Sequence, residues 1–410
     1  MGMNDTPRGE RLHIALFGRR NAGKSSLINA ITGQKIAIVS EHKGTTTDPV
    51  YKAMELLPLG PVVLIDTPGL DDEGELGQER IKKTREVLDR TDLALVLMDG
   101  TLGLSAWEDE LVHTLKERKI PFLFLINKED QMLDMDQKVE LKMEISDRYD
   151  IPSLLLSASQ GTGVEELKRR LGQLEKGRKQ SEKRIVGDLV KTGDFVLLVI
   201  PIDKAAPKGR LILPQQQTIR DLLDAGASVI VVRDTELKDT LERLPERPKL
   251  IITDSQAFGK VSQIVPRDVL LTSFSILFAR YKGELSDLVQ GAKVLEELQD
   301  GDRILMAEGC THHRQCDDIG TVKIPAWIRE YTKKEILIET SSGNSFPKDL
   351  SSYKMIVHCG ACTLNEKEMK SRMERAKEQQ IPMVNYGILI AYMNGILKRS
   401  LEPFPDQSLL

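Results

Sequence analysis

All four cysteines of the chain lie in its last quarter, and three of its six histidines stand beside them. One group contains Cys310 and His312, and the other contains His358, Cys359 and Cys362. Thiolate and imidazole groups are ligands of zinc and of iron-sulfur centres. The clustering therefore indicates a metal site whose two arms are far apart in sequence.

Disulfide bonds are a weaker explanation for these thiols. No apolar segment precedes Arg11, and no stretch of the chain approaches the roughly 20 consecutive apolar residues that a membrane span needs. We therefore expect a cytoplasmic protein without a membrane partner. In a reducing compartment four cysteines, two of them spaced Cys-x-x-Cys, favour metal ligands or redox groups.

The length and charge of the chain limit its organisation and partners. A chain of 410 residues is too long for one hydrophobic core and suits two or three domains. Its 58 basic and 62 acidic residues give a net charge of -4, which is not typical of a protein that binds nucleic acid. We expect no nucleic-acid partner.

The first 160 residues contain a second chemical signature, a set of nucleotide-binding motifs. Residues Gly18 to Ser25 fit the phosphate-loop pattern G-x-x-x-x-G-K-[ST] between a predicted strand and a predicted helix. In that setting backbone N–H groups surround the phosphates, Lys24 reaches the β- and γ-phosphates, and Ser25 coordinates Mg²⁺. Asp66 and Gly69, in Asp-Thr-Pro-Gly, follow a later strand, where Asp66 can hold Mg²⁺ through water and the Gly69 N–H can contact the γ-phosphate.

Two further motifs select the base. In the sequence Asn-Lys-Glu-Asp, Asp130 can accept hydrogen bonds from guanine N1–H and the exocyclic amine, Asn127 supports the loop and N7, and the Lys128 stem covers the base. Ser157 and Ala158 supply the loop under O6. Because adenine would leave the Asp130 carboxylate unpaired, and such sites reject an unmatched base by about 10⁴ to 10⁵ at best, we predict GTP as the substrate.

The predicted elements place these motifs on an α/β fold. Between residues 12 and 174 short β-rich runs alternate with helical stretches, which is typical of a parallel sheet. The predicted strands are 14–18, 62–66, 93–99, 122–127 and 153–157. A polar, basic stretch at 175–184 reads as a linker. We therefore predict a P-loop GTPase domain at 1–174.

Two further small α/β domains are predicted after the linker. The segment 185–265 is rich in β-branched residues and has no chemical motif, which favours a homodimer interface, with a passive spacer as the alternative. The segment 268–410 contains the cysteines. Its predicted elements, with those of 185–265, are strands 195–202, 228–232, 250–253, 303–306, 335–339 and 355–357, and helices 215–225, 236–244, 284–298 and 366–380.

Two of the cysteines each follow a predicted strand of this last domain. Cys310 comes shortly after strand 303–306, and Cys359 comes shortly after strand 355–357. Open α/β sheets build their sites at the carboxyl ends of strands, so the two arms of the metal site can converge there.

The nucleotide motifs resemble those of the TrmE and Era group of GTPases over residues 11–174. The loop 44–48 resembles the first switch, which implies Thr46 as a Mg²⁺ ligand, although its two neighbouring threonines leave the register open. Asn21 stands where TrmE-like GTPases place a potassium-binding asparagine, so K⁺ is implied at the β,γ-bridge; a simple turn residue is the alternative. Leu70 replaces the water-orienting glutamine of many GTPases, and we expect slow intrinsic hydrolysis.

The predicted nucleotide site combines the motifs with this resemblance. We expect Lys24, Asn21, Thr46, Asp66 and Gly69 to support hydrolysis, with Arg19 and Arg20 as less favoured sources of charge. The residues expected to contact GTP, Mg²⁺ or K⁺ are Gly18, Asn21, Ala22, Gly23, Lys24, Ser25, Ser26, Thr46, Asp66, Gly69, Asn127, Lys128, Asp130, Ser157 and Ala158.

The pattern Cys-x-His, 45 intervening residues, then His-Cys-x-x-Cys closely resembles the motif of the HydF family of FeFe-hydrogenase maturation GTPases. The resemblance implies a 4Fe-4S cluster held by Cys310, Cys359 and Cys362 with one exchangeable iron corner. His312, His358, Asp317 or water could occupy that corner, and Cys316 is an extra thiol outside the motif.

The same resemblance implies a function and a set of partners. The chain would carry a transient di-iron precursor at the exchangeable corner and deliver it to apo FeFe-hydrogenase, in concert with the radical-SAM maturases. From the ligand types alone, a closed Cys₃His zinc site is equally compatible. The alternatives are therefore a zinc-containing GTPase of tRNA modification or ribosome assembly, and a GTPase that senses redox state through an iron-sulfur cluster.

Overall fold

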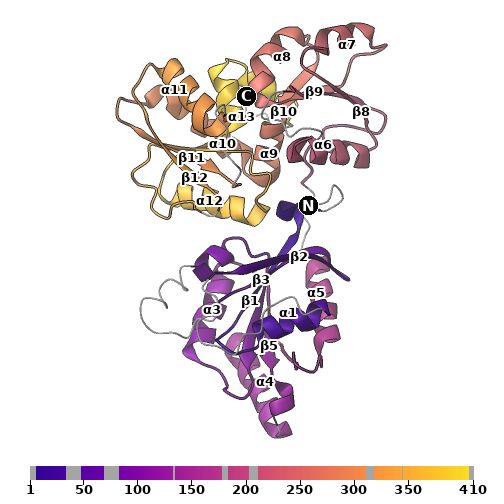
Figure 1. Ribbon diagram of the computed structural model, residues 1–410, viewed down its shortest axis with the longest axis vertical. Helices are drawn as coiled ribbons and strands as arrows, with labels where there is room; N and C mark the ends of the chain where they lie inside the picture. Colours follow the sequence, from indigo (N-terminus) through magenta and orange to yellow (C-terminus); the bar gives the residue numbers. More distant parts are fainter. Residues whose placement is uncertain are drawn as a thin grey trace. The chain divides into compact units, whose positions relative to one another are not determined.

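The computed structural model of the protein describes residues 6–33, 48–68, 83–132, 134–177, 183–202, 211–310, 318–343 and 345–405. The chain divides into two compact units, Met1–Ser181 and Glu182–Leu410 (Figure 1). Both units are built from open, mainly parallel sheets with helices packed against them.

The first unit contains a six-stranded sheet with the order β2-β3-β1-β4-β5-β6. Neighbouring strands run parallel, except that β2 lies antiparallel to β3 at one edge. The strands are β1 (Leu12–Phe17), β2 (Val50–Leu56), β3 (Gly60–Asp66), β4 (Leu93–Asp99), β5 (Phe122–Asn127) and β6 (Ser153–Leu155).

Helices cover both faces of this sheet. Successive side chains of a strand point to opposite faces, so the residues of one strand divide between two buried clusters. Ala15 and Phe17 of β1 pack in one buried cluster with residues of α3 (Ala106–Glu117) and α4 (Met135–Tyr149). Ile14 and Leu16 pack in the other cluster, with residues of α1 (Lys24–Thr32) and α5 (Val164–Gly177). The long apolar runs read from the sequence therefore belong to strands that are buried on both faces.

The second unit contains two four-stranded sheets, in the orders β10-β9-β7-β8 and β12-β11-β13-β14. All their strand pairs are parallel. The strands are β7 (Phe195–Val199), β8 (Ser228–Val232), β9 (Leu250–Thr253), β10 (Leu270–Ser273), β11 (Arg303–Glu308), β12 (Leu337–Ser342), β13 (Met355–His358) and β14 (Met383–Asn385). The helices are α6 (Leu213–Asp224), α7 (Leu237–Arg243), α8 (Phe258–Ile264), α9 (Phe274–Lys282), α10 (Leu285–Ala292), α11 (Ile324–Thr332), α12 (Glu366–Glu378), α13 (Tyr386–Met393) and α14 (Leu397–Leu401).

One continuous hydrophobic core joins the two sheets of the second unit. Phe258 of α8, Phe274 of α9 and Ile356 of β13 all belong to it and are at most 2% exposed. Burying a side chain of this size contributes about 1.5–3 kcal/mol. The shared core therefore fixes the sheet that ends in the cysteines against the sheet that precedes it.

The predicted fold class is confirmed: a P-loop domain is followed by further α/β structure with parallel sheets. All the strands predicted from the sequence are present, with shifts of a few residues at their ends. β2, β10 and β14 were not predicted, and β10 continues the second sheet past residue 265, where we expected the second domain to end. The domain limits 1–174, 185–265 and 268–410 stay a prediction. No helix in the described ranges is long and apolar enough to span a membrane.

Candidate functional site

The phosphate loop joins β1 to α1 and takes the tight path that its glycines permit. Gly23, which precedes α1, has a φ of 95°, and a Cβ atom there would lie 2.2 Å from Asn127 Nδ2. Asn21 is also left-handed, with a φ of 59°. Asparagine tolerates this conformation better than most residues. The backbone conformation of Asn21 is therefore equally compatible with a role as a turn residue and with a role as a potassium ligand.

Lys24 lies inside the loop rather than in solvent. Its side chain is buried, and Nζ donates to the carbonyl oxygens of Gly18 at 2.7 Å and Arg19 at 2.9 Å. A phosphate group would compete with these carbonyls for the ammonium and would bring a full negative charge to it. The Lys24 ammonium is thus held within the phosphate loop by the carbonyls of the loop itself.

Ser25, predicted to bind Mg²⁺ directly, and Asp66, predicted to hold it through water, lie together at the ends of α1 and β3. Ser25 Oγ donates to Asp66 Oδ2 at 2.7 Å. Asp66 Oδ1 is buried and has no hydrogen-bond partner within the described ranges. Burial raises the pKa of Asp66, while the bond from Ser25 and the charge of Lys24 oppose the rise. An unpaired buried carboxylate oxygen beside a hydroxyl is the donor set that Mg²⁺ prefers, so these residues fit the ion.

Asn127 connects the phosphate loop with the base-recognition loop. Its Nδ2 donates to Ala22 O at 2.8 Å, and its Oδ1 accepts from Ala158 N at 2.9 Å. Asp130 accepts from Ser157 Oγ at 2.6 Å. The structure therefore brings together the residues that the sequence predicted around the base.

Asp99 is a member of this site that sequence reasoning missed. Lys128 is left-handed, with a φ of 65°, and its Nζ donates to the buried Asp99 carboxylate at 2.5 Å. Burial alone would raise the pKa of Asp99, but the hydrogen bond and charge of Lys128, with the bonds from Thr101, hold that pKa below its usual value. Asp99 therefore anchors the lysine whose stem is predicted to cover the base. No spacing rule marks it, since it ends an apolar strand.

The side chain of Arg19 is bonded to residues outside the phosphate loop. Its Nε donates to Glu108 Oε1 at 3.0 Å, and Nη2 donates to Gly103 O at 2.5 Å. Glu108 is fully buried and also caps α3 through Ser105. This placement argues against Arg19 as a source of charge for hydrolysis.

Several predicted residues lie outside the part of the chain that the structure describes. In the nucleotide site they are Thr46, Gly69 and Leu70, and near the cysteines they are His312, Cys316 and Asp317. Their predicted roles stay predictions.

The cysteine arms converge as the sequence predicted. β11 and β13 are neighbouring parallel strands, with Ala307 opposite His358. The carboxyl ends of these strands are therefore adjacent, and Cys310 and Cys359 follow them within two residues. Two strands that are distant in sequence bring the two arms to one edge of the sheet.

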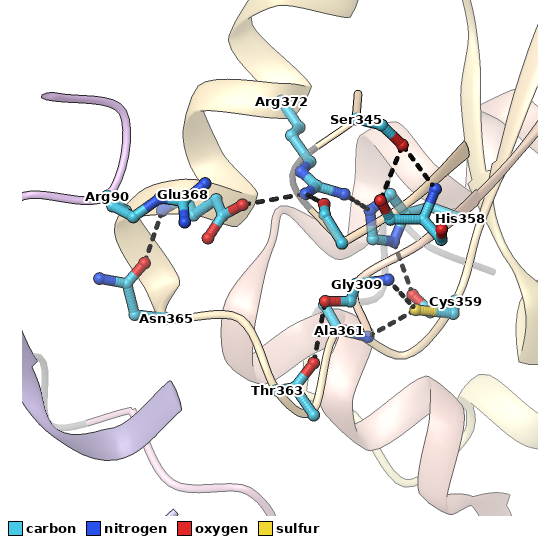
Figure 2. Close-up of polar contacts among 12 residues, drawn as sticks. Arg90, Gly309, Ser345, His358, Cys359, Ala361, Thr363, Asn365, Glu368 and Arg372 are labelled. Atoms are coloured by element: carbon cyan, nitrogen blue, oxygen red, sulfur yellow. Dashed lines mark hydrogen bonds and ion pairs between the residues drawn. The ribbon is translucent and has the colours of Figure 1, made fainter. Parts of the chain in front are cut away.

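Backbone amides surround the Cys359 sulfur (Figure 2). Its Sγ accepts from Gly309 N at 3.1 Å and from Ala361 N at 3.4 Å. Ala361 is left-handed, with a φ of 54°, and Thr363 Oγ1 donates to Gly309 O at 3.1 Å. These contacts close the Cys-x-x-Cys loop over the end of β11 and present N–H donors to a thiolate.

Burial and mutual repulsion disfavour ionised thiols at this edge. Burial, together with the charges of Cys359 and Glu308, raises the pKa of Cys310 to about 12. Burial, together with the charges of Cys359 and Cys310, likewise raises the pKa of Cys362 to about 12. The three sulfurs therefore lie close enough to interact. Within the described ranges, however, no group of three or more His, Cys, Asp or Glu side chains has the placement of a metal site.

His358 is buried and is engaged through both ring nitrogens. Arg372 Nη1 can only donate, so its 3.1 Å contact makes His358 Nε2 an acceptor, and Nδ1–H then donates to Cys359 O at 2.9 Å. Burial, with the charge of Arg372, lowers the pKa of His358 to about 3. Arg372 is fixed in turn by Glu368 at 2.9 Å and Gly343 O at 2.5 Å. A neutral imidazole without a free lone pair argues against His358 as the fourth iron ligand.

Lys282, near the cysteines, is another residue that was not predicted from the sequence. It is 1% exposed at the end of α9, and its Nζ donates to Leu364 O at 2.5 Å. Its charge opposes the rise in the pKa of Cys362. A buried cation beside thiols favours an anionic sulfur centre there.

Known proteins that resemble the first unit are GTPases. The chain is 35% identical over 159 residues to the tRNA modification GTPase MnmE of Heliobacterium modesticaldum, covering 38% of this chain and 33% of that protein. It is 32% identical over 160 residues to the GTPase Era of Carboxydothermus hydrogenoformans, covering 38% and 52%. The chain thus spans between a third and about half of these relatives. A crystal structure of Aquifex aeolicus Era bound to GDP and AlF₄⁻ matches 62% of this chain and 97% of that one, with 18% identity and a TM-score of 0.37.

Family models assign the rest of the chain. Residues 13–128 match the model described as a 50S ribosome-binding GTPase, and together with the phosphate loop they define a P-loop GTPase that carries additional α/β domains. Residues 185–283 match the hydrogen maturase F dimerization domain, and residues 286–403 match the hydrogen maturase F tetramerization domain. The chain belongs to the hydrogen maturase F, or HydF, family.

Proposed function

We propose that the protein hydrolyses GTP and serves as a scaffold in the maturation of FeFe-hydrogenase. In this proposal Cys310, Cys359 and Cys362 hold a 4Fe-4S cluster with one exchangeable corner. The protein carries a di-iron precursor there and delivers it to apo FeFe-hydrogenase, with the radical-SAM maturases as further partners. Membership of the HydF family supports the role in hydrogenase maturation.

The observation that carries the cluster proposal is the environment of the Cys359 sulfur. Two backbone N–H groups point at it, and a neighbouring strand end supplies Cys310. Hydrogen bonds to sulfur are a standard means by which proteins stabilise and tune iron-sulfur groups. Burial disfavours the ionised thiolates here, so without a metal the thiols stay protonated. A bound cation would neutralise the thiolates and remove this cost of burying their charge. The donor set therefore fits an iron-sulfur group.

The exchangeable corner is the part of the proposal that gives a carrier its chemistry. Three cysteines leave one iron of a cubane without a protein sulfur, so that a ligand from a precursor can bind and later leave. Of the proposed fourth ligands, His312 and Asp317 lie outside the described residues, and His358 is already bonded through both nitrogens. Water or one of the first two residues is therefore favoured over His358.

Potassium is proposed as an activator of GTP hydrolysis. Asn21 lies at the turn of the phosphate loop, and Arg19 is tied to Glu108 and Gly103. With Arg19 unavailable, a monovalent cation is the favoured source of positive charge at the β,γ-bridge. Hydrolysis would then alter switch contacts and bias the docking of partners.

A homodimer through the segment 185–265 is also proposed. β8 is the edge strand of its sheet, and Ile230 and Val231 are 37% and 44% exposed. An exposed apolar edge strand promotes association unless another chain covers it. The match to the dimerization domain spans this strand and supports the assignment.

Anaerobic reconstitution with iron and sulfide, followed by EPR, tests the cluster proposal. We expect a reduced S = 1/2 signal that is lost in Cys359→Ala and retained in Cys316→Ala, the matched control outside the motif. Stoichiometric zinc without such a signal would instead favour the zinc-containing GTPase. A hydrolysis rate that follows the oxidation state of the cluster would favour the redox sensor.

A transfer assay tests the carrier role separately. Protein co-expressed with the radical-SAM maturases is purified without oxygen and incubated with apo FeFe-hydrogenase. Hydrogen production is expected with wild-type protein and not with Cys359→Ala. If loaded wild-type protein gives no hydrogen production, the carrier role is wrong, even where the cluster is present.

A further inference from the structure

Tyr386 occupies a position equivalent to Cys359 on the neighbouring strand. β13 and β14 are parallel neighbours, and His358 is paired with Asn385. Cys359 and Tyr386 are the residues that directly follow this pair. Because β11, β13 and β14 are adjacent in the sheet, Cys310, Cys359 and Tyr386 all leave the same edge.

The Tyr386 hydroxyl is buried without a hydrogen-bond partner. The residue is 6% exposed, and its Oη makes no hydrogen bond within the described ranges. An unpaired buried hydroxyl costs about 1–3 kcal/mol, so its position calls for an explanation. Burial and the charges of Cys359, Glu308, Asp318 and Cys310 raise the pKa of Tyr386 well above its usual value, so the phenol keeps its proton.

The backbone at Gly320 leaves room for the Tyr386 hydroxyl, because glycine has no side chain. A Cβ atom at Gly320 would lie 2.4 Å from Tyr386 Oη and 2.5 Å from Glu308 Oε1. The segment Ile319–Lys323 is held in place by Asp318, whose carboxylate accepts from Thr321 N at 2.8 Å. A side chain at residue 320 would therefore push against the phenol oxygen, which lies directly beside the Gly320 backbone.

We infer that the Tyr386 hydroxyl donates a hydrogen bond to an anionic sulfur of the iron-sulfur group held by Cys310 and Cys359, and so positions that group and tunes its potential. The inference rests on the proposed cluster. Tyr386 is a positioning residue, since three cysteines suffice to bind the iron. Its phenol adds a third donor to the two amides that already face the Cys359 sulfur.

The experiment compares wild-type protein with Tyr386→Phe after anaerobic reconstitution of the full chain. Hydrogen bonds to cluster sulfur stabilise the reduced, more negative state. We therefore expect equal iron content, a more negative reduction potential in an EPR-monitored titration, and altered g-values in the variant. Tyr353→Phe is the matched control, because the Tyr353 hydroxyl is already bonded to Glu339 at 2.7 Å. Its potential should equal that of wild type.

Each outcome separates this inference from the cluster proposal. Wild-type protein that takes up no cluster defeats the proposed function itself. A wild-type cluster whose potential and spectrum are unchanged in Tyr386→Phe overturns the inference alone. A folded Tyr386→Phe protein that binds no iron also overturns it, because the residue would then be structural.

A second variant covers the case in which Tyr386→Phe does not fold. Gly320→Ala keeps the hydroxyl but crowds it, since the new methyl carbon would lie 2.4 Å from Oη. The same negative shift in potential would support the inference, and an unchanged potential would refute it.

Discussion

Replacing Asn127 by alanine should strongly destabilise the first unit. The side chain is 2% exposed and satisfies two buried backbone groups, the carbonyl of Ala22 and the N–H of Ala158. Leaving one buried group unpaired costs about 1–3 kcal/mol, so the expected loss is about 2–6 kcal/mol. Since a domain is stable by about 5–15 kcal/mol, this is a large fraction of the total.

The two tryptophans of the chain allow the loss to be assigned to one unit. Trp107 lies in α3 of the first unit and Trp327 lies in α11 of the second. In a Trp327→Phe background, fluorescence during urea unfolding reports on the first unit alone. Asn127→Ala should lower the midpoint, and the extrapolated free energy of unfolding should fall by the stated amount.

Two further variants make the test specific. Ser159→Ala is the control, because its hydroxyl is exposed and lies 3.5 Å from Asp130, and it should cost less than about 0.5 kcal/mol. Asn127→Asp keeps an acceptor for Ala158 N but places an oxygen against Ala22 O, so it should also destabilise. A loss below about 1 kcal/mol in Asn127→Ala would refute the reasoning, since water would then be replacing both bonds.

Three other predictions follow from the site geometry. GTP turnover should be faster in K⁺ than in Na⁺, and Asn21→Ala should remove the difference; equal wild-type rates in both salts would discard the potassium site. Lys128 lowers the pKa of Asp99 in the folded state, so the Asp99 carboxylate stabilises the first unit at pH values above its unfolded pKa. This stabilisation is lost as the pH falls through the folded pKa. Asp99→Asn should therefore flatten the dependence of the urea midpoint on pH in the acid range, and an unchanged slope would contradict the pairing. His358→Gln can both accept from and donate to the present partners of the ring, so the reduced EPR signal should persist; its loss from a folded protein would show that His358 binds iron.

The sequence predicted the central strands well because they are buried on both faces. β4, Leu93–Asp99, is fully buried and appears in the sequence as an unbroken apolar run, 93–98, that ends at Asp99. β2, Val50–Leu56, was missed because it is an exposed edge strand that mixes polar and apolar residues. β14, Met383–Asn385, has three residues and passes directly into the apolar helix α13, so no periodicity separates the two elements.

The same contrast holds for the candidate sites. Lys24, Asn127 and the cysteines belong to spaced motifs, and spacing is visible in a sequence. Lys282 and Tyr386 are single residues that belong to no spaced motif, and only the fold brings them to the sheet edge beside the cysteines. A lone lysine or tyrosine becomes informative when its burial and its partners are known.

The parallel pairing of β11 with β13 has a consequence for how freely this region of the chain can vary in length. Between these strands, α11 and β12 lie outside the junction of the two cysteine arms in the strand order. Insertions or deletions in the turn at 333–336, which connects α11 to β12, would leave the junction intact. The short step from Cys359 to Cys362 has no such freedom, because a single added residue would carry the Ala361 amide away from the sulfur that it faces.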